Sequence, residues 1–195
     1  MAGTKGGIAR GQPLALELLM ADHRAVEELF DKFEQEKDGD EATRRDIAQR
    51  ICNELAVHAQ VEEELLYTWL RENLDDDDME MVEEAQIEHN TAKDLIAQIE
   101  SATDIDEQYN AKVKVLGEYT RHHVNEEENE MFPKVRDMQE ELDELGQEIA
   151  ARKDELKEEL GMDAADSDET EEEGEETPAS ARSSRGREGT HRGTR

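Results

Sequence analysis

The sequence predicts an all-α protein: an up-down-up-down four-helix bundle followed by an additional C-terminal helix and a disordered tail. Three observations lead to this fold class. Gly and Pro nearly vanish between the two ends of the chain. Apolar residues in that stretch recur every three or four positions, which is the period of an α-helix. Turn and capping residues divide the stretch into long segments with short links, and such segments pack as antiparallel neighbours.

The pattern predicts helices at about 14–36, 40–73, 78–101, 104–132 and 134–160. Pro13 suits the first turn of the first helix, because its missing N–H is not needed there. Asp40 follows Gly39 and is a good N-cap for the second helix. The acidic run 75–78 precedes the third helix and favours its N-terminus through the helix dipole.

Either Thr103 or Asp104 is expected to cap the fourth helix, and Pro133 to mark its end or a kink. The last helix carries an apolar stripe. Its members are Met138, Leu142, Leu145, Ile149, Leu156 and Leu160. This stripe would either cover the bundle or form a weak contact with a second copy or another protein, and covering the bundle is the simpler interpretation.

We therefore expect a flexible N-terminus at 1–12, the bundle at 13–135, an amphipathic helix at 136–161 and a disordered tail at 162–195. Residues 163–176 contain nine acids and no base, and residues 177–195 contain five Arg. Neither stretch can bury enough apolar surface to offset its chain entropy.

Composition excludes several kinds of partner. With 54 Asp and Glu against 23 Lys and Arg, the formal net charge of −31 disfavours nucleic acid and anionic membrane surfaces. No apolar run approaches the roughly 20 residues of a membrane span, and the first residues lack the apolar segment of a secretory signal. Cys52 is alone, so no internal disulfide or thiolate-rich metal site is expected. We expect a soluble cytoplasmic protein.

Each of the first four predicted helices carries one His near the middle of its apolar stripe. These are His23, His58, His89 and His123. Two of them are followed four residues later by Glu62 and Glu127, which therefore share their helix face. A single His on an apolar face is usually a hydrogen-bonded core residue. Four in matching register, with two carboxylates that would each cost several kcal/mol to bury alone, favour a metal site.

The neighbouring His122 also has a Glu four residues later, so the pair spacing alone does not choose between His122 and His123. The stripe does. Leu116, His123 and Glu127 continue an apolar face, whereas Glu118, His122 and Glu126 lie on a charged one. We therefore expect His122 to be exposed.

Four segments resemble the hemerythrin-like (HHE cation-binding) family over about residues 14–135: Asp22–Phe30, His58–Tyr67, Glu88–Asn90 and His123–Pro133. The resemblance implies a four-helix bundle around a non-haem di-iron centre. Its ligands would be His23, His58, Glu62, His89, His123 and Glu127, with the two Glu bridging two iron ions. Lys93 stands where oxygen-carrying hemerythrins have a second His, so the pattern is more similar to the bacterial subclass.

A centre of this kind implies a protein that binds or processes O2, NO or hydrogen peroxide at an open iron position. Peroxide decomposition and NO oxidation are the enzymatic versions of this hypothesis. Iron storage or buffering, and a helical interaction module with a structural metal, are the alternatives; ferritin-like storage sites are richer in carboxylates. Tyr119 and Glu54 lie one turn before a proposed ligand and could supplement the centre, although bundle packing is the favoured role of Tyr119.

Overall fold

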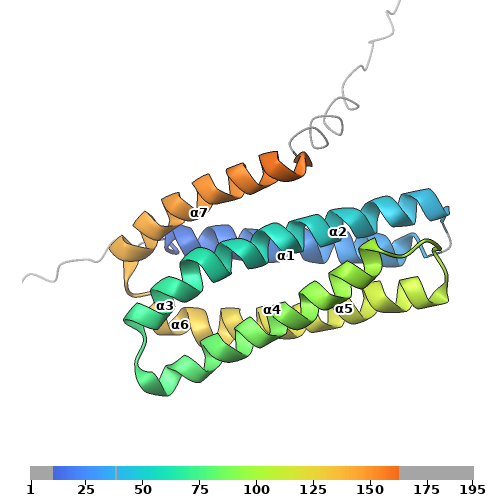
Figure 1. Ribbon diagram of the computed structural model, residues 1–195. Coiled ribbons are helices and arrows are strands. Elements are labelled where there is room, and N and C mark those ends of the chain that lie inside the picture. Colours follow the sequence, from blue (N-terminus) through green and yellow to red (C-terminus); the bar gives the residue numbers. More distant parts are fainter. Residues whose placement is uncertain (1–10, 38, 163–195) are drawn as a thin grey trace, which may run out of the picture. The chain divides into compact units, whose positions relative to one another are not determined.

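A computed structural model describes residues 11–37 and 39–162, and every regular element in these two ranges is a helix. The long helices are α1 (Leu14–Gln35), α2 (Glu41–Val61), α4 (Met79–Glu100), α5 (Glu107–Glu126) and α7 (Gln139–Leu160). The first four form an antiparallel bundle, and α7 lies along α1 and α2 (Figure 1). The predicted all-α bundle with an additional C-terminal helix is confirmed.

The predicted flexible segment 1–12 and the predicted tail 162–195 lie outside the described residues, apart from residues 11, 12 and 162. In the part of the chain that the structure describes, no helix is both long enough and apolar enough to traverse a lipid bilayer.

Two of the long helices continue through a single π-helical turn into a shorter α-helical segment. The π-helical turn η1 (Glu62–Leu66) joins α2 to α3 (Tyr67–Asn73), and η3 (Glu127–Met131) joins α5 to α6 (Phe132–Val135). A short 3-10 turn, η2 (Asp76–Asp78), precedes α4. Both π-helical turns begin at a Glu predicted to face inward, and such turns are frequent at functional sites.

Two of the helices begin at an N-cap residue whose own side chain caps the first turn. Asp40 accepts a hydrogen bond from the backbone N–H of Thr43 at 3.0 Å, which confirms its predicted role. The prediction for the fourth helix was wrong, because α5 begins at Glu107 and Asp106 caps it by accepting from the N–H of Tyr109 at 2.8 Å.

The residues before α5 cannot begin a helix because α2 holds their backbone in the link. The Arg45 guanidinium donates to the carbonyls of Ala102 and Thr103, at 3.0 and 2.8 Å. Arg44 donates to the carbonyl of Ile105, whose side chain is buried in the core.

Replacing Asp106 by Ala should lower the free energy of unfolding by about 1 kcal/mol, because the first turn of α5 loses its capping acceptor. Denaturant unfolding measures this change. Asp104→Ala is the matched control and should leave the stability nearly unchanged. Equal losses in the two variants would contradict the assignment of the cap.

Pro133 neither ends the helix, since α6 extends to Val135, nor starts the next one, since α7 begins at Gln139 and not at 134. Inside an α-helix a Pro removes one hydrogen bond and its ring collides with the carbonyl four residues earlier. The preceding turn η3 is wider: the N–H of Phe132 bonds to the carbonyl of Glu127, five residues back. Pro133 therefore falls in the first turn of α6, where its missing N–H is tolerated.

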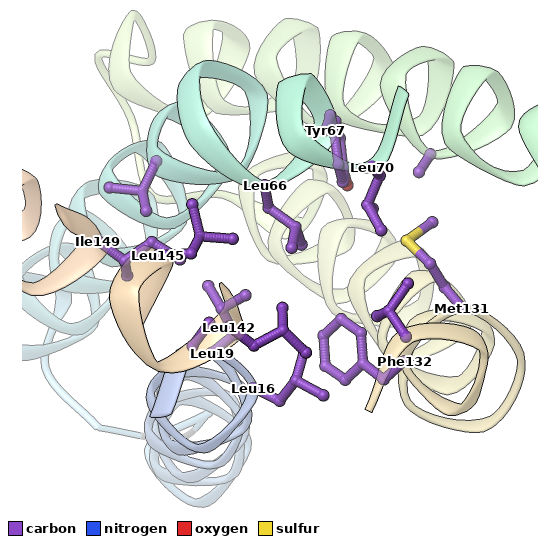
Figure 2. Close-up of a cluster of buried hydrophobic side chains, with 14 of the residues drawn as sticks. Leu16, Leu19, Leu66, Tyr67, Leu70, Met131, Phe132, Leu142, Leu145 and Ile149 are labelled. Carbon is purple, nitrogen blue, oxygen red and sulfur yellow. The ribbon is translucent and has the colours of Figure 1, made fainter. Parts of the chain in front are cut away.

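Buried apolar residues form two clusters. The cluster shown in Figure 2 includes Leu16, Leu66, Phe132 and Leu142, and it joins α7 to the bundle. The other cluster belongs to the bundle alone. Its larger members include Val26, Phe30, Ile51, Ile96 and Leu116. In α1, α4 and α5 the predicted ligands His23, His89 and His123 come from positions between those that supply the two clusters.

The apolar stripe of α7 covers the bundle, as the simpler interpretation predicted. Leu142, Leu145, Ile149 and Leu156 are buried, whereas Leu160 at the end of the stripe remains 50% exposed.

The backbones of α7 and α1 come very close at Gly146. A Cβ atom at this position would lie 2.6 Å from the backbone nitrogen of Ala15 and 2.7 Å from Cγ of Leu14. One turn earlier, Asp143 accepts a hydrogen bond from the N–H of Leu14 at 2.8 Å, and so caps α1 where Pro13 offers no capping side chain. Only Gly permits this approach, and the approach in turn lets α7 cap α1.

Candidate metal centre

The four predicted His ligands come from four different helices and meet inside the bundle. His23 of α1 and His58 of α2 form one pair, with their Nε2 atoms 3.1 Å apart. His89 of α4 and His123 of α5 form the other pair, with Nε2 atoms 3.0 Å apart. All four side chains are buried, and all four Nε2 atoms point to one interior volume.

The two predicted carboxylates lie between the His pairs. Glu62 Oε2 is 3.2 Å from Nε2 of His58 and 3.3 Å from Nε2 of His89. Glu127 Oε2 is 3.4 Å from Nε2 of His23 and 3.6 Å from Nε2 of His123. Each carboxylate thus reaches one imidazole of each pair, which is the placement that a bridging ligand of two cations requires.

Donor atoms of these residues form two groups in which all atoms lie within 4.8 Å of one another. The first group is His23, His58, Glu62 and Glu127, and the second is Glu62, His89 and His123. Because Glu62 belongs to both, the geometry offers two adjacent cation positions that share a carboxylate.

Electrostatics show that the six side chains fit a bound cation. Glu62 is fully buried, and neither of its carboxylate oxygens has a hydrogen-bond partner. Burial, together with the negative charge of Glu127, raises the pKa of Glu62 to about 7. Oε2 of Glu127 is also without a hydrogen-bond partner. Buried carboxylate oxygens left in this way are costly, and a multivalent cation between them and the imidazoles would satisfy them.

The pKa values of two of the imidazoles are shifted in opposite directions. Burial and the neighbouring His123 lower the pKa of His89 to about 4. Burial is the largest single influence on His123 and acts to lower its pKa, but the charge of Glu127, the hydrogen bond and charge of Glu88 and the charge of Glu62 together outweigh it and raise this pKa to about 9. Titratable groups whose pKa values are driven apart at one buried location are typical of functional sites.

A carboxylate faces the outer nitrogen, Nδ1, of each His. The pairs are Glu128 with His23 (2.8 Å), Asp22 with His58 (3.5 Å), Glu63 with His89 (3.1 Å) and Glu88 with His123 (2.9 Å). Each of the four helices supplies one inward His, and each helix or the π-helical turn that continues it supplies one carboxylate for the His of a neighbouring helix. A proton held on Nδ1 leaves the lone pair of Nε2 free for a metal ion, so the hydrogen bonds of Glu128, Glu63 and Glu88 orient three of the imidazoles. Nδ1 of His58 faces Asp22 without a hydrogen bond.

The sequence prediction missed these outer carboxylates, although the chain carries a signal for them. Asp22 and Glu88 directly precede a predicted ligand, and Glu63 and Glu128 directly follow one. Adjacent residues on a helix are rotated by about 100°, so a residue next to an inward ligand faces the neighbouring helix.

Comparison with known proteins agrees with this geometry. Residues 14–135 match the family model described as the hemerythrin HHE cation binding domain. The chain belongs to this family. A DNA nickase from Nostoc sp. (strain PCC 7120 / SAG 25.82 / UTEX 2576) is 26% identical over 150 residues, which cover 76% of this chain and 41% of the nickase. The chain therefore matches less than half the length of this relative, and no solved structure matches it.

The HHE domain also contains a buried Tyr that the sequence prediction did not assign to the site. The Tyr67 hydroxyl donates a hydrogen bond to Glu127 Oε1 at 2.9 Å and lies 3.2 Å from Nε2 of His89. Tyr67 stands nine residues after His58, and Phe132 stands nine after His123. The matching position in the second segment is a Phe, so a hydroxyl is not needed to fill this buried space. A buried Tyr hydroxyl needs a polar partner, and this need could have assigned Tyr67 to the site from the sequence.

Tyr67→Phe should weaken metal binding by this HHE domain roughly 10-fold, since losing the outer hydrogen bond of a ligand typically costs 10- to 100-fold in affinity. Competition with a chelator of known affinity measures the change. Tyr119→Phe is the control and should keep the wild-type affinity. Equal affinities of Tyr67→Phe and wild type would show that the hydroxyl does not support Glu127.

Three other residues singled out from the sequence lie outside the two donor groups. Tyr119 is 43% exposed at the edge of the buried face of α5, so the expectation that it packs within the bundle was wrong. Glu54 turns away from the centre and pairs with Lys157 of α7 at 3.2 Å. The side chain of His122 is 61% exposed.

One side of the centre opens into a small cavity of about 30 Å³. Its walls include all four His and the apolar side chains of Val26, Leu55, Ala92 and Ile96. This volume accommodates one molecule of about the size of water. We call this cavity the apolar chamber; it lies next to the predicted metal positions.

Proposed function

We propose that this HHE domain holds two non-haem iron ions, with His23, His58, Glu62, His89, His123 and Glu127 as ligands. The observation that carries the proposal is the membership of Glu62 in two adjacent donor groups. Glu62 and Glu127 would bridge the two ions, because each lies between one His of each pair. Imidazole and carboxylate ligands are compatible with iron, and the two donor groups contain no thiolate of the kind that selects Cu(I) or iron–sulfur clusters.

We further propose that the centre binds O2, NO or hydrogen peroxide. Six protein ligands leave positions open on two octahedral ions, and iron with an open position can bind such molecules and exchange electrons with them. The apolar chamber supports this assignment, because Val26, Leu55 and Ile96 admit a small uncharged molecule and limit the entry of water. The free, buried thiol of Cys52 suits a reducing compartment, and we propose the cytoplasm as the location.

Iron storage is less well supported than small-molecule binding. A storage site is expected to be rich in carboxylates, whereas four of the six proposed ligands here are imidazoles. Nor do we extend nicking of DNA to this chain. The relative named a nickase shares 41% of its length with it, and the net charge of −31 opposes binding to DNA phosphates.

Stopped-flow mixing of the iron-loaded protein, reduced and oxidised, with O2, NO and hydrogen peroxide tests the proposed function. A reversible spectral change with O2 or NO is expected if the protein carries or senses the ligand, and repeated consumption of NO or peroxide if it is an enzyme. The metal-free protein is the control. The absence of any spectral change or consumption with all three molecules would contradict the proposal.

A further inference from the structure

A second cavity, of different chemistry, leads to the other side of the centre. It has a volume of about 50 Å³ and lies between α4 on one side and α5 with η3 on the other. At its inner end are the proposed ligands His123 and Glu127. Toward solvent its walls carry the carboxylates of Glu84, Glu88, Glu126 and Glu130, and no Lys or Arg lines it. The apolar chamber suits a neutral molecule, whereas this cavity suits a cation.

Three side chains form a further group of metal donors at the surface beside this cavity, and two of them, Glu88 and Glu126, line the cavity itself. His122 Nε2 lies 3.3 Å from Oε1 of Glu126 and 3.7 Å from Oε1 of Glu88. Donor atoms of the three residues lie within 4.8 Å of one another. His122 and Glu126 repeat the four-residue spacing of the inward pairs, one position earlier along the same helix.

The inner end of the cavity reaches the proposed centre. Glu127 is 1% exposed, it lines the cavity, and its Oε2 has no hydrogen-bond partner. Glu88 connects the two ends, since its Oε1 faces His122 and its Oε2 lies 2.9 Å from Nδ1 of His123. Potential cation ligands therefore follow one another from the surface to the centre with no Lys or Arg between them.

We infer that Glu88, His122 and Glu126 form a surface site for a divalent cation, and that ferrous iron enters the buried centre from this site through the carboxylate-lined cavity. The inference rests on the proposed function only in that the centre takes iron. Acidic side chains around a narrow opening raise the local concentration of cations and hence their rate of entry. The site acts on the rate of loading, because none of its three residues belongs to the six proposed ligands.

Rapid mixing of the metal-free protein, residues 1–195, with Fe²⁺ under anaerobic conditions tests the route. The unbound iron is quenched with a colorimetric chelator at successive times. His122→Ala and Glu126→Gln should each lower the initial rate of uptake several-fold, and the two together roughly 10-fold. The final iron content should equal that of the wild type. The control is Glu144→Gln with Glu148→Gln, which neutralises two exposed acids four residues apart on α7, and its rate should stay within about two-fold of the wild type.

An unchanged rate of iron uptake in the His122 and Glu126 variants would overturn the inference. A reduced final iron content would overturn it too, because these residues would then be ligands or structural supports.

A second experiment tests the surface site when the centre is disabled. In Glu62→Gln, which removes the carboxylate shared by both donor groups of the centre, titration with Mn²⁺ followed by electron paramagnetic resonance should find one bound ion, and adding His122→Ala should abolish it. Binding unaffected by His122→Ala would refute the surface site. If the wild type does not hold two irons but the surface site still binds Mn²⁺, the proposed function is refuted and the surface site is not.

Discussion

Glu62→Gln should abolish metal binding at both positions of the centre. Glu62 contributes to both donor groups, and the neutral amide keeps the shape of the side chain but loses the charge that holds a cation. Iron content after loading and desalting should fall from about two per chain to nearly none. Glu34→Gln, at an exposed position of α1, is the control and should load like the wild type.

The same variant separates the stability of the metal-free protein from that of the loaded one. In the wild type, iron should raise the melting temperature by roughly 10 °C, because a ligand bound far above its dissociation constant contributes several kcal/mol. This increase should disappear in Glu62→Gln. Without metal, the variant should melt at or above the wild-type temperature, because a buried carboxylate without hydrogen-bond partners has been replaced by a neutral group. A variant that loads two irons, or that melts well below the metal-free wild type, would contradict the bridging role.

Gly146→Ala should destabilise the protein, although Ala is normally the better helix former. At an exposed position within a helix, replacing Gly by Ala raises the free energy of unfolding by about 1 kcal/mol. Here the new Cβ would lie 2.6 Å from the backbone nitrogen of Ala15, and a backbone atom cannot move aside alone. We expect α7 to shift away from α1, at a cost of 1–3 kcal/mol typical of overpacking, and the melting temperature to fall by roughly 2–8 °C.

Gln147→Ala provides the control for Gly146→Ala, because this neighbouring side chain is exposed and its replacement should change the stability by less than about 0.5 kcal/mol. The shift of α7 has a consequence for the centre. Lys153 of α7 binds Asp22, and Asp22 faces Nδ1 of His58. Gly146→Ala should therefore release iron to a chelator faster than Gln147→Ala does. A stabilised Gly146→Ala variant would show that the close approach of the two helices is not as described.

The sequence was sufficient to predict the helices and the inward residues, because both depend on a local period. The stripe that includes Leu116, His123 and Glu127 follows the turn of α5, so its buried face could be assigned without knowing its neighbours. The start of α5 could not be predicted in the same way. It depends on Arg44 and Arg45 of α2, which hold the preceding carbonyls, and no local pattern reports that contact.

The outer parts of the site were missed for a similar reason. In a chain with 54 acids, a Glu or Asp next to a predicted ligand carries little information by itself. Only the packing of the helices shows that Glu63 faces His89 and that Glu88 faces His123. The two π-helical turns were also absent from the prediction, because their widened hydrogen bonding has no simple sequence pattern. They begin at Glu62 and Glu127, the two residues that we propose as bridges.

Anaerobic titration of the metal-free protein with Fe²⁺, followed by the content of bound iron after removal of the excess, tests the di-iron centre most directly. The six side chains arranged around the shared Glu62 predict an end point of two irons per chain. The same stoichiometry should be found as iron, and not as zinc, in protein purified from its native cells. An end point of one iron or fewer, or stoichiometric zinc in the native protein, would contradict the di-iron centre.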